Sequence, residues 1–267
     1  MLASASARIL PPVLHPLMLR APMLRAVPRD ATAPPFPGIA HALVTVARDG
    51  EIFPEASPAT HVYKVLSGTL RTAKLLADGR RQIGAFVFAG EWVGFDGGPR
   101  HFYAAEAVTE ARLLRFSRRD LERLMAEDRE AARTIRDMLC GTLAAAHERI
   151  VSLGRKTALE RVASFLADIE EHLADDAKNG FVLPMSRGDI ADYLGLTVET
   201  VSRILGDLRR RHVIRIEEAH HVRIIDPTLL RGLIPESHDA TLAREAEEAL
   251  WPKPQHGRQA AASGHRG

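Results

Sequence analysis

The sequence predicts an α+β fold in three parts: a small antiparallel β-domain, a long helix, and a helical domain that includes a β-hairpin. Three patterns support this prediction. Short strand-like segments separated by turn residues fill residues 37–127. A continuous helical pattern follows over residues 128–153, and two short helices with a later alternating hairpin lie within residues 154–235. Strands first and helices afterwards are typical of an α+β architecture.

The two ends of the chain do not fit these patterns. Residues 1–36 are rich in proline, which interrupts every apolar run and argues against a signal peptide. Residues 236–267 are rich in Ala, Gly, His and Pro. We therefore expect both ends to be disordered, except for a short helix near residues 240–250. No apolar run reaches the length of a membrane span, so we expect a cytoplasmic protein.

The β-domain is predicted from turn residues spaced along residues 40–116. Asp78-Gly79 is a strong signal for a tight hairpin. Short strands at such spacing predict a barrel or a double-sheet jelly roll. The expected strands cover residues 62–66, 70–76, 82–88, 103–108 and 112–116, and the expected turn or bulge glycines are Gly68, Gly84, Gly90 and Gly94.

The long helix is expected to follow a short capped helix that starts at residues 117–120. Six of its residues recur in steps of four and three, which is typical of a coiled-coil seam. We expect this seam to mediate dimerisation, although packing against the β-domain is a compatible alternative. A further helix over residues 155–173 should pack on the C-terminal domain, with a hinge near Leu153-Gly154. The predicted seam consists of Ile135, Leu139, Thr142, Ala146, Arg149 and Leu153.

The most informative segment, residues 185–208, predicts a helix-turn-helix. Ser186 and Asp189 have the spacing of a capping box. Gly195 permits a sharp turn, and Thr197 is a natural N-cap for the second helix. One face of that helix is apolar and should be buried; it contains Val201, Ile204, Leu205 and Leu208.

The opposite face of the second helix presents polar side chains near its N-terminus. Arg203 can donate two hydrogen bonds to guanine, Glu199 can accept from cytosine, and the Ser202 hydroxyl suits either partner. The alternative is that Glu199 and Arg203 only form an exposed i,i+4 pair. We expect the three to read DNA bases. Supporting or backbone contacts are expected from Ser186, Arg187, Thr197, Val198, Thr200 and Arg209.

The residues after this helix predict a winged version of the motif. Residues 209–212 are basic and suit either DNA phosphates or a solvated surface. Residues 213–216 and 221–225 alternate around a polar turn, as expected for a hairpin. A short strand over residues 181–184 and a last helix capped by Asp226 complete the domain.

The segment Gly188–Arg203 closely resembles the helix-turn-helix of the CRP/FNR superfamily, in its FNR and FixK-like branch. The likeness extends through residues 61–68, 78–83 and 105–109 and covers roughly residues 40–230. It implies a cyclic-nucleotide-binding-like β-roll, a dimerisation helix and a winged helix-turn-helix. It also implies a homodimeric regulator, an activator that contacts RNA polymerase, with Glu199, Ser202 and Arg203 reading a palindrome close to TTGAT-N4-ATCAA.

The sequence offers little for the signals that this superfamily commonly senses. Phe95 and Phe102-Tyr103 stand where cyclic-AMP-binding relatives carry the glutamate and arginine that hold the nucleotide. Cys140 is the only cysteine, whereas an iron–sulfur cluster needs four ligands. We expect Cys140 to be a buried apolar residue, with redox sensing as the alternative. We therefore expect no cofactor, with a regulator gated by a small molecule or haem as the other possibility.

Histidine ligands and enzymatic activity are not indicated either. Haem could use His61 or His101, but both fall in segments that do not imply haem, and His220-His221 fits a polar wing turn better than a metal site. A cupin-like enzyme needs a His-x-His pair, which this chain lacks. A free-standing cyclic-nucleotide-binding module is disfavoured by the missing arginine. We expect a DNA-binding protein and no enzyme.

Overall fold

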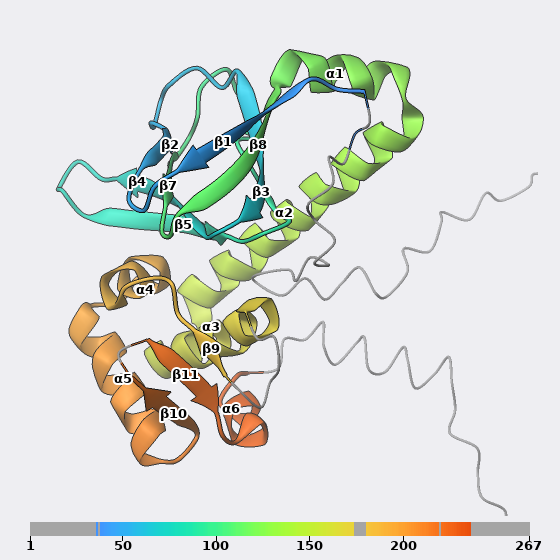
Figure 1. The fold of residues 1–267 in the computed structure, drawn as a ribbon. Helices are drawn as coiled ribbons and strands as arrows, with labels where there is room; N and C mark the ends of the chain where they lie inside the picture. Colours follow the sequence, from blue (N-terminus) through green and yellow to red (C-terminus); the bar gives the residue numbers. More distant parts are fainter. Residues whose placement is uncertain (1–35, 37, 174–179, 219, 236–267) are drawn as a thin grey trace, which may run out of the picture. The chain divides into compact units, whose positions relative to one another are not determined.

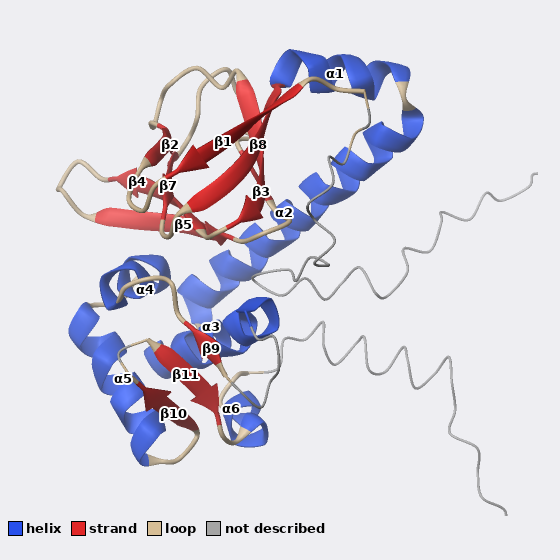
Figure 2. Cartoon of the chain, viewed as in Figure 1, coloured by secondary structure: helices blue, strands red, loops and turns tan. Residues whose placement is uncertain are grey.

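The computed structural model describes residues 36, 38–173, 180–218 and 220–235. The predictions of disorder for residues 1–36 and 236–267, and of a helix near residues 240–250, lie outside this part, apart from Phe36. The predicted α+β architecture is confirmed: a β-roll, three consecutive helices and a winged helix-turn-helix follow one another along the chain (Figures 1 and 2).

The β-roll consists of two four-stranded antiparallel sheets. One sheet has the strand order β1-β8-β3-β6 and the other β2-β7-β4-β5. Val65, Leu70 and Leu113 are fully buried among the side chains of this domain. The strands are β1 (His41–Val46), β2 (Glu51–Phe53), β3 (His61–Ser67), β4 (Leu70–Leu75), β5 (Arg81–Val87), β6 (Trp92–Val93), β7 (Ala104–Ala107) and β8 (Ala111–Ser117).

One expected glycine has a clear steric reason. The β4–β5 pairing shifts register between Thr72 and Ala73, opposite Gly84. A Cβ atom on Gly84 would lie 2.9 Å from the ring of Tyr103. Such a distance is far inside van der Waals contact, so Gly84 lets the bulged strand pass close to this tyrosine.

Three helices follow the β-roll: α1 (Arg118–Glu127), α2 (Arg129–Arg155) and α3 (Ala158–Leu173). Asp128 caps α2 by accepting from the backbone N–H groups of Glu130 and Ala131. Helix α2 ends two residues beyond the predicted end, and Gly154 lies inside it. The chain leaves the helical conformation at Lys156 instead, so the break falls after the predicted hinge.

The C-terminal domain contains β9 (Phe181–Val182), α4 (Arg187–Leu194), α5 (Val198–Arg210), β10 (Ile214–Glu217), β11 (His221–Ile224) and α6 (Pro227–Gly232). Its strands form an antiparallel sheet of order β10-β11-β9. Strand β5 of the β-roll shares a hydrophobic core with this domain. The ring of Phe86 lies 5.0 Å from that of Tyr193 on α4 and 6.3 Å from that of Phe165 on α3, measured between ring centres.

The predicted seam on α2 is wrong at two positions. Ile135 is 1% exposed because it packs in the chain's own core with α1 and β8. Arg149 points into the chain and donates hydrogen bonds to backbone carbonyl oxygens of β5 and α4. Four exposed apolar residues of α2, two of them from the predicted seam, also follow steps of four and three: Leu139, Leu143, Ala146 and Ile150.

The prediction that Cys140 is buried is also wrong. Cys140 is an exposed free cysteine. It lies next to Leu139, on the side of α2 that faces away from the β-roll core around Ile135. None of the described helices is long and apolar enough to cross a lipid bilayer.

Candidate nucleic-acid interface

Helix α4 begins and ends as the sequence predicts. The Ser186 hydroxyl accepts from the Asp189 N–H at 3.0 Å, and the Asp189 carboxylate accepts from the Ser186 N–H at 3.0 Å. These two bonds form the predicted capping box. At the other end Gly195 has a φ of 63°, the left-handed conformation that glycine adopts without strain.

Helix α5 is placed by its own cap and by its apolar face. The Thr197 hydroxyl accepts from the Thr200 N–H at 3.2 Å. The four predicted core residues are buried: Val201, Ile204, Leu205 and Leu208. The helix therefore turns its other face outward, where Glu199, Ser202 and Arg203 are all exposed. Val198, beside them, is 43% exposed and adds an apolar contact surface.

Glu199 is held in its ionised form at the start of α5. Hydrogen bonds from its own backbone N–H and from the Thr197 hydroxyl keep the pKa of Glu199 below its ordinary value. No ion pair joins Glu199 to Arg203 in the described part of the chain. The arrangement thus leaves an acceptor and a cationic donor side by side, as base reading requires.

The structure gives the surroundings of Ser186, Arg187 and Thr200, three of the residues predicted to support DNA binding. Ser186 is engaged in the capping box, and Thr200 supplies the N–H that Thr197 caps. Arg187 is half-buried at the first turn of α4, and burial lowers its pKa. Its buried Nη1 atom has no hydrogen-bond partner among the described residues.

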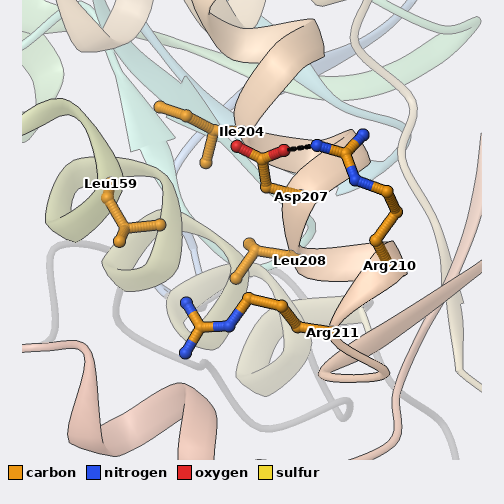
Figure 3. Close-up of a pocket in the computed structure, with 6 residues that line it drawn as sticks. All are labelled: Leu159, Ile204, Asp207, Leu208, Arg210 and Arg211. Atoms are coloured by element: carbon orange, nitrogen blue, oxygen red, sulfur yellow. Dashed lines mark hydrogen bonds and ion pairs between the residues drawn. The ribbon is translucent and has the colours of Figure 1, made fainter.

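The C-terminal end of α5 carries the basic run. Arg209 is exposed, whereas Arg210 forms an ion pair with Asp207. This pair (Figure 3) and Arg211 line a depression of about 330 Å³. The floor of the depression is apolar and is formed by Leu159, Ile204 and Leu208. Along α5 and its C-cap the lining runs from Ile204 to Arg211, about one to three turns of helix beyond Glu199, and includes none of the three candidate base-reading residues.

The wing carries its own charge network. Glu217 lies 3.7 Å from both Arg215 and Arg223, and 3.6 Å from the Nδ1 atom of His221. The described residues contain no group of three or more His, Cys, Asp or Glu side chains that could hold a metal ion. His220 lies in the turn of the wing, and His221 begins β11.

Comparison with known proteins agrees with this geometry. A Crp-like helix-turn-helix domain model matches residues 160–233, and a cyclic nucleotide-binding domain model matches residues 43–128. The nitrogen fixation regulation protein FixK of Azorhizobium caulinodans is 42% identical over 79% of this chain and 87% of its own. The chain belongs to the CRP/FNR family of transcription regulators.

Other members of the family show the same relation. FixK of Rhizobium meliloti is 38% identical over 74% of this chain and 90% of its own. The solved structure of FixK2 from Bradyrhizobium japonicum is 40% identical, covers 74% of this chain and all of that one, and superposes with a TM-score of 0.72. A CRP-family regulator from Thermus thermophilus is 26% identical over 74% of this chain and 99% of its own, with a TM-score of 0.63.

Phe95 and Phe102, which the sequence resemblance places at the nucleotide-contacting positions of cyclic-AMP-binding relatives, have contacts of their own within the chain. Phe95 packs edge-on against Trp92 in the core, with 5.7 Å between ring centres. Phe102 is 60% exposed and lies under the Lys74 ammonium at 4.0 Å. An aromatic ring offers no pairing for a nucleotide phosphate, and an unpaired buried charge is costly.

Sequence reasoning missed the residues that fasten the helix-turn-helix to the rest of the chain. Arg71, Arg81 and Gln82 on β4 and β5 all reach α4. Their partners are more than a hundred residues away, so no local motif marks them.

Proposed function

We propose that this CRP/FNR protein is a cytoplasmic transcription activator that binds a palindrome close to TTGAT-N4-ATCAA as a homodimer. Glu199, Ser202 and Arg203 read the bases of each half-site. The observation that carries this proposal is the outward face of α5, where these three side chains are exposed opposite a fully packed face. A recognition helix uses such a face, near its N-terminus, in the major groove.

The names of similar proteins support activation. FnrL of Cereibacter sphaeroides, a transcriptional activator protein, is 36% identical over 62% of this chain. AadR of Rhodopseudomonas palustris, a transcriptional activatory protein, is 36% identical over 66%. An activator of this kind contacts RNA polymerase, and we place the protein in oxygen-responsive regulation. Its role is DNA binding and not catalysis.

The exposed apolar stripe of α2 supports the homodimer. Leu143 is 57% exposed and Ile150 is 68% exposed, although both are large apolar residues. With Leu139 and Ala146 they repeat every three to four residues, the spacing by which two helices pack in a coiled coil. A two-fold dimer presents two copies of α5 to the two halves of a palindrome.

We further propose that DNA binding requires no cyclic nucleotide, haem or iron–sulfur cluster. Phe95 and Phe102 replace the polar nucleotide contacts, and one cysteine cannot ligate a cluster. The alternative is a gated sensor. In that case Cys140 oxidation is a candidate signal, because the thiol is exposed and not buried as the sequence predicts. A depression of about 290 Å³ lined by Phe95, Met125 and Leu139 is where a small apolar ligand would enter.

Anisotropy titration of the full chain against labelled duplexes tests this proposal. The protein, purified in air, should bind the palindrome but not a scrambled duplex of the same composition, with or without cyclic AMP. Cys140→Ser should bind equally well before and after peroxide treatment. Binding that appears only with cyclic AMP or haem would refute ligand independence. Binding lost on oxidation in the native chain but retained in Cys140→Ser would establish the gated alternative.

A further inference from the structure

Asp189 links the start of α4 to the β-roll. Its Oδ2 atom accepts from the Ser186 N–H and hydroxyl, which completes the capping box. Its Oδ1 atom accepts from Arg81 at 2.6 Å and from Arg71 at 3.3 Å. The Asp189 side chain is only 6% exposed. One carboxylate therefore closes the cap of the helix-turn-helix and receives both β-roll arginines.

Both arginines are themselves anchored. The Nε atom of Arg71, on β4, donates to Glu106 on β7 at 2.7 Å. The Nε atom of Arg81, on β5, donates to Asp192 on α4 at 2.8 Å. Arg81 thus contacts two carboxylates three residues apart on α4, those of Asp189 and Asp192, which restrains the orientation of the helix as well as its position.

The last turn of α4 is held through its backbone. The C-terminal carbonyl groups of a helix lack partners inside the helix. Here Gln82 donates to the Asp192 carbonyl at 2.8 Å, Arg149 donates to that of Tyr193, and Arg161 donates to that of Leu194 at 3.1 Å. We call the five donating side chains the α4 clamp: Arg71, Arg81, Gln82, Arg149 and Arg161.

The charged part of the clamp is sheltered enough to matter energetically. Burial acts to raise the pKa of Asp189, but hydrogen bonds from Ser186 and the charges of Arg71 and Arg81 outweigh it and hold this pKa below its ordinary value. Partly buried pairs are screened by salt less than exposed ones. Removing one partner leaves a buried charge uncompensated, which costs more than an exposed pair contributes.

We propose that Arg71 and Arg81 are positioning residues for the recognition helix, and that they act through α4 without touching DNA. This inference rests on the proposed function. Palindrome reading requires two α5 helices at a set spacing. Helix α5 packs on α4, the clamp ties α4 to β5 and α2, and α2 carries the dimer stripe. The clamp thus transmits the dimer geometry to both recognition helices.

Binding to a single half-site does not depend on the spacing of the two α5 helices. A positioning defect should therefore weaken binding to the palindrome more than binding to a half-site, whereas loss of folding would weaken both. The experiment titrates the full chain against two duplexes, one with the complete palindrome and one with a single half-site. The variants are Arg81→Ala, Asp192→Ala and the double variant, because this pair is about one-third exposed and its removal leaves the capping box intact. Arg80→Ala is the matched control, since Arg80 lies on the same hairpin and, among the residues that the structure describes, its side chain pairs only with the nearby Asp78.

Each single variant should reduce the ratio of palindrome to half-site affinity about fivefold or more, the usual lower range of coupling between sites. The double variant should lose no more than Arg81→Ala alone, because Arg81→Ala already removes the Arg81–Asp192 contact together with the Arg81–Asp189 contact. Arg80→Ala should leave the ratio unchanged. An unchanged ratio in the clamp variants, additive losses, or tighter palindrome binding would overturn the proposal.

A measurement without DNA separates this inference from the proposed function. Amide hydrogen exchange in α4 should accelerate in Arg81→Ala and Asp192→Ala relative to Arg80→Ala. If the native protein does not prefer the palindrome over scrambled DNA, the proposed function fails, and accelerated exchange would still establish the clamp. Equal exchange in all three variants would show that no clamp exists.

Discussion

Arg149 on α2 donates a hydrogen bond to the carbonyl oxygen of Tyr193, and its guanidinium carbon lies 3.7 Å from the centre of the Tyr193 ring. The same Nη2 atom also donates to the carbonyl of Ile83 on β5 at 2.8 Å. Burial lowers the pKa of Arg149, although its contacts with Tyr193 act in the opposite direction. Arg149, which the sequence predicts in the dimer seam, therefore connects α2 to β5 and α4 within one chain.

Arg149→Met should lower the free energy of unfolding by about 2 kcal/mol or more. The variant keeps much of the side-chain volume but leaves the Tyr193 carbonyl without its side-chain donor and the Ile83 carbonyl with the Gln82 donor alone. A buried carbonyl left unsatisfied costs roughly 1–3 kcal/mol. Urea denaturation measures the change. Arg136→Met, on the exposed face of the same helix, is the control and should change stability by less than about 0.5 kcal/mol. Equal effects of the two substitutions would contradict this role for Arg149.

Leu143→Glu should convert the dimer into a monomer, because it places a charge in the middle of the exposed stripe of α2. Sedimentation velocity measures the oligomeric state. Leu75→Glu is the matched control, since Leu75 is equally apolar and 67% exposed but lies on β4. A dimeric Leu143→Glu protein, or dissociation by both variants, would exclude the stripe as the dimer interface.

Arg203→Ala should weaken binding to the cognate palindrome by about 1–3 kcal/mol per half-site and leave binding to random DNA nearly unchanged. Arg209→Ala should instead weaken all sequences alike and reduce the salt dependence of binding, because an exposed arginine at the C-terminal end of α5 suits a phosphate contact. Titrations at several salt concentrations distinguish the two. Equal losses on both DNAs for Arg203→Ala would reassign it to the backbone.

Asp168 on α3 should make stability depend on pH. Burial raises its pKa to about 7, against the opposing charge of Lys156 and with a smaller contribution in the same direction from Glu171. Between about pH 4 and 7 the unfolded chain has lost this proton while the folded protein keeps it, so the contribution of Asp168 to stability falls as pH rises. The free energy of unfolding of Asp168→Asn, relative to that of the native chain, should therefore rise between about pH 4 and 7 and stay constant above pH 7. A pH-independent difference between the two proteins would refute the shift.

The helix-turn-helix could be predicted closely because its signals are local. The capping box of Ser186 and Asp189, the turn at Gly195 and the cap at Thr197 each depend on residues within four positions of one another. Strands β1, β2 and β6 were not individually predicted, since β6 contains only Trp92 and Val93 and exists through pairing with β3.

The sequence of α2 alone does not show which face of the helix forms the dimer seam. This helix has apolar residues on two faces, and steps of four and three fit both. Only the folded chain shows that Ile135 packs on the β-roll while Leu143 stays exposed. The α4 clamp was equally hidden, because Arg81 and Asp189 are 108 residues apart in the sequence.

Base-by-base binding measurement on the palindrome tests the central claim most directly. Every position of TTGAT-N4-ATCAA is changed in turn, and the affinity of the air-purified full chain is measured without added ligand. The native protein should bind the intact palindrome at nanomolar to sub-micromolar concentration, with losses of about 1–3 kcal/mol at specific bases of each half-site. Glu199→Ala and Arg203→Ala should each remove the preference at the base they read. Equal affinity for every substituted duplex, or preferences that survive both substitutions, would contradict the assignment of α5 as the DNA-reading element.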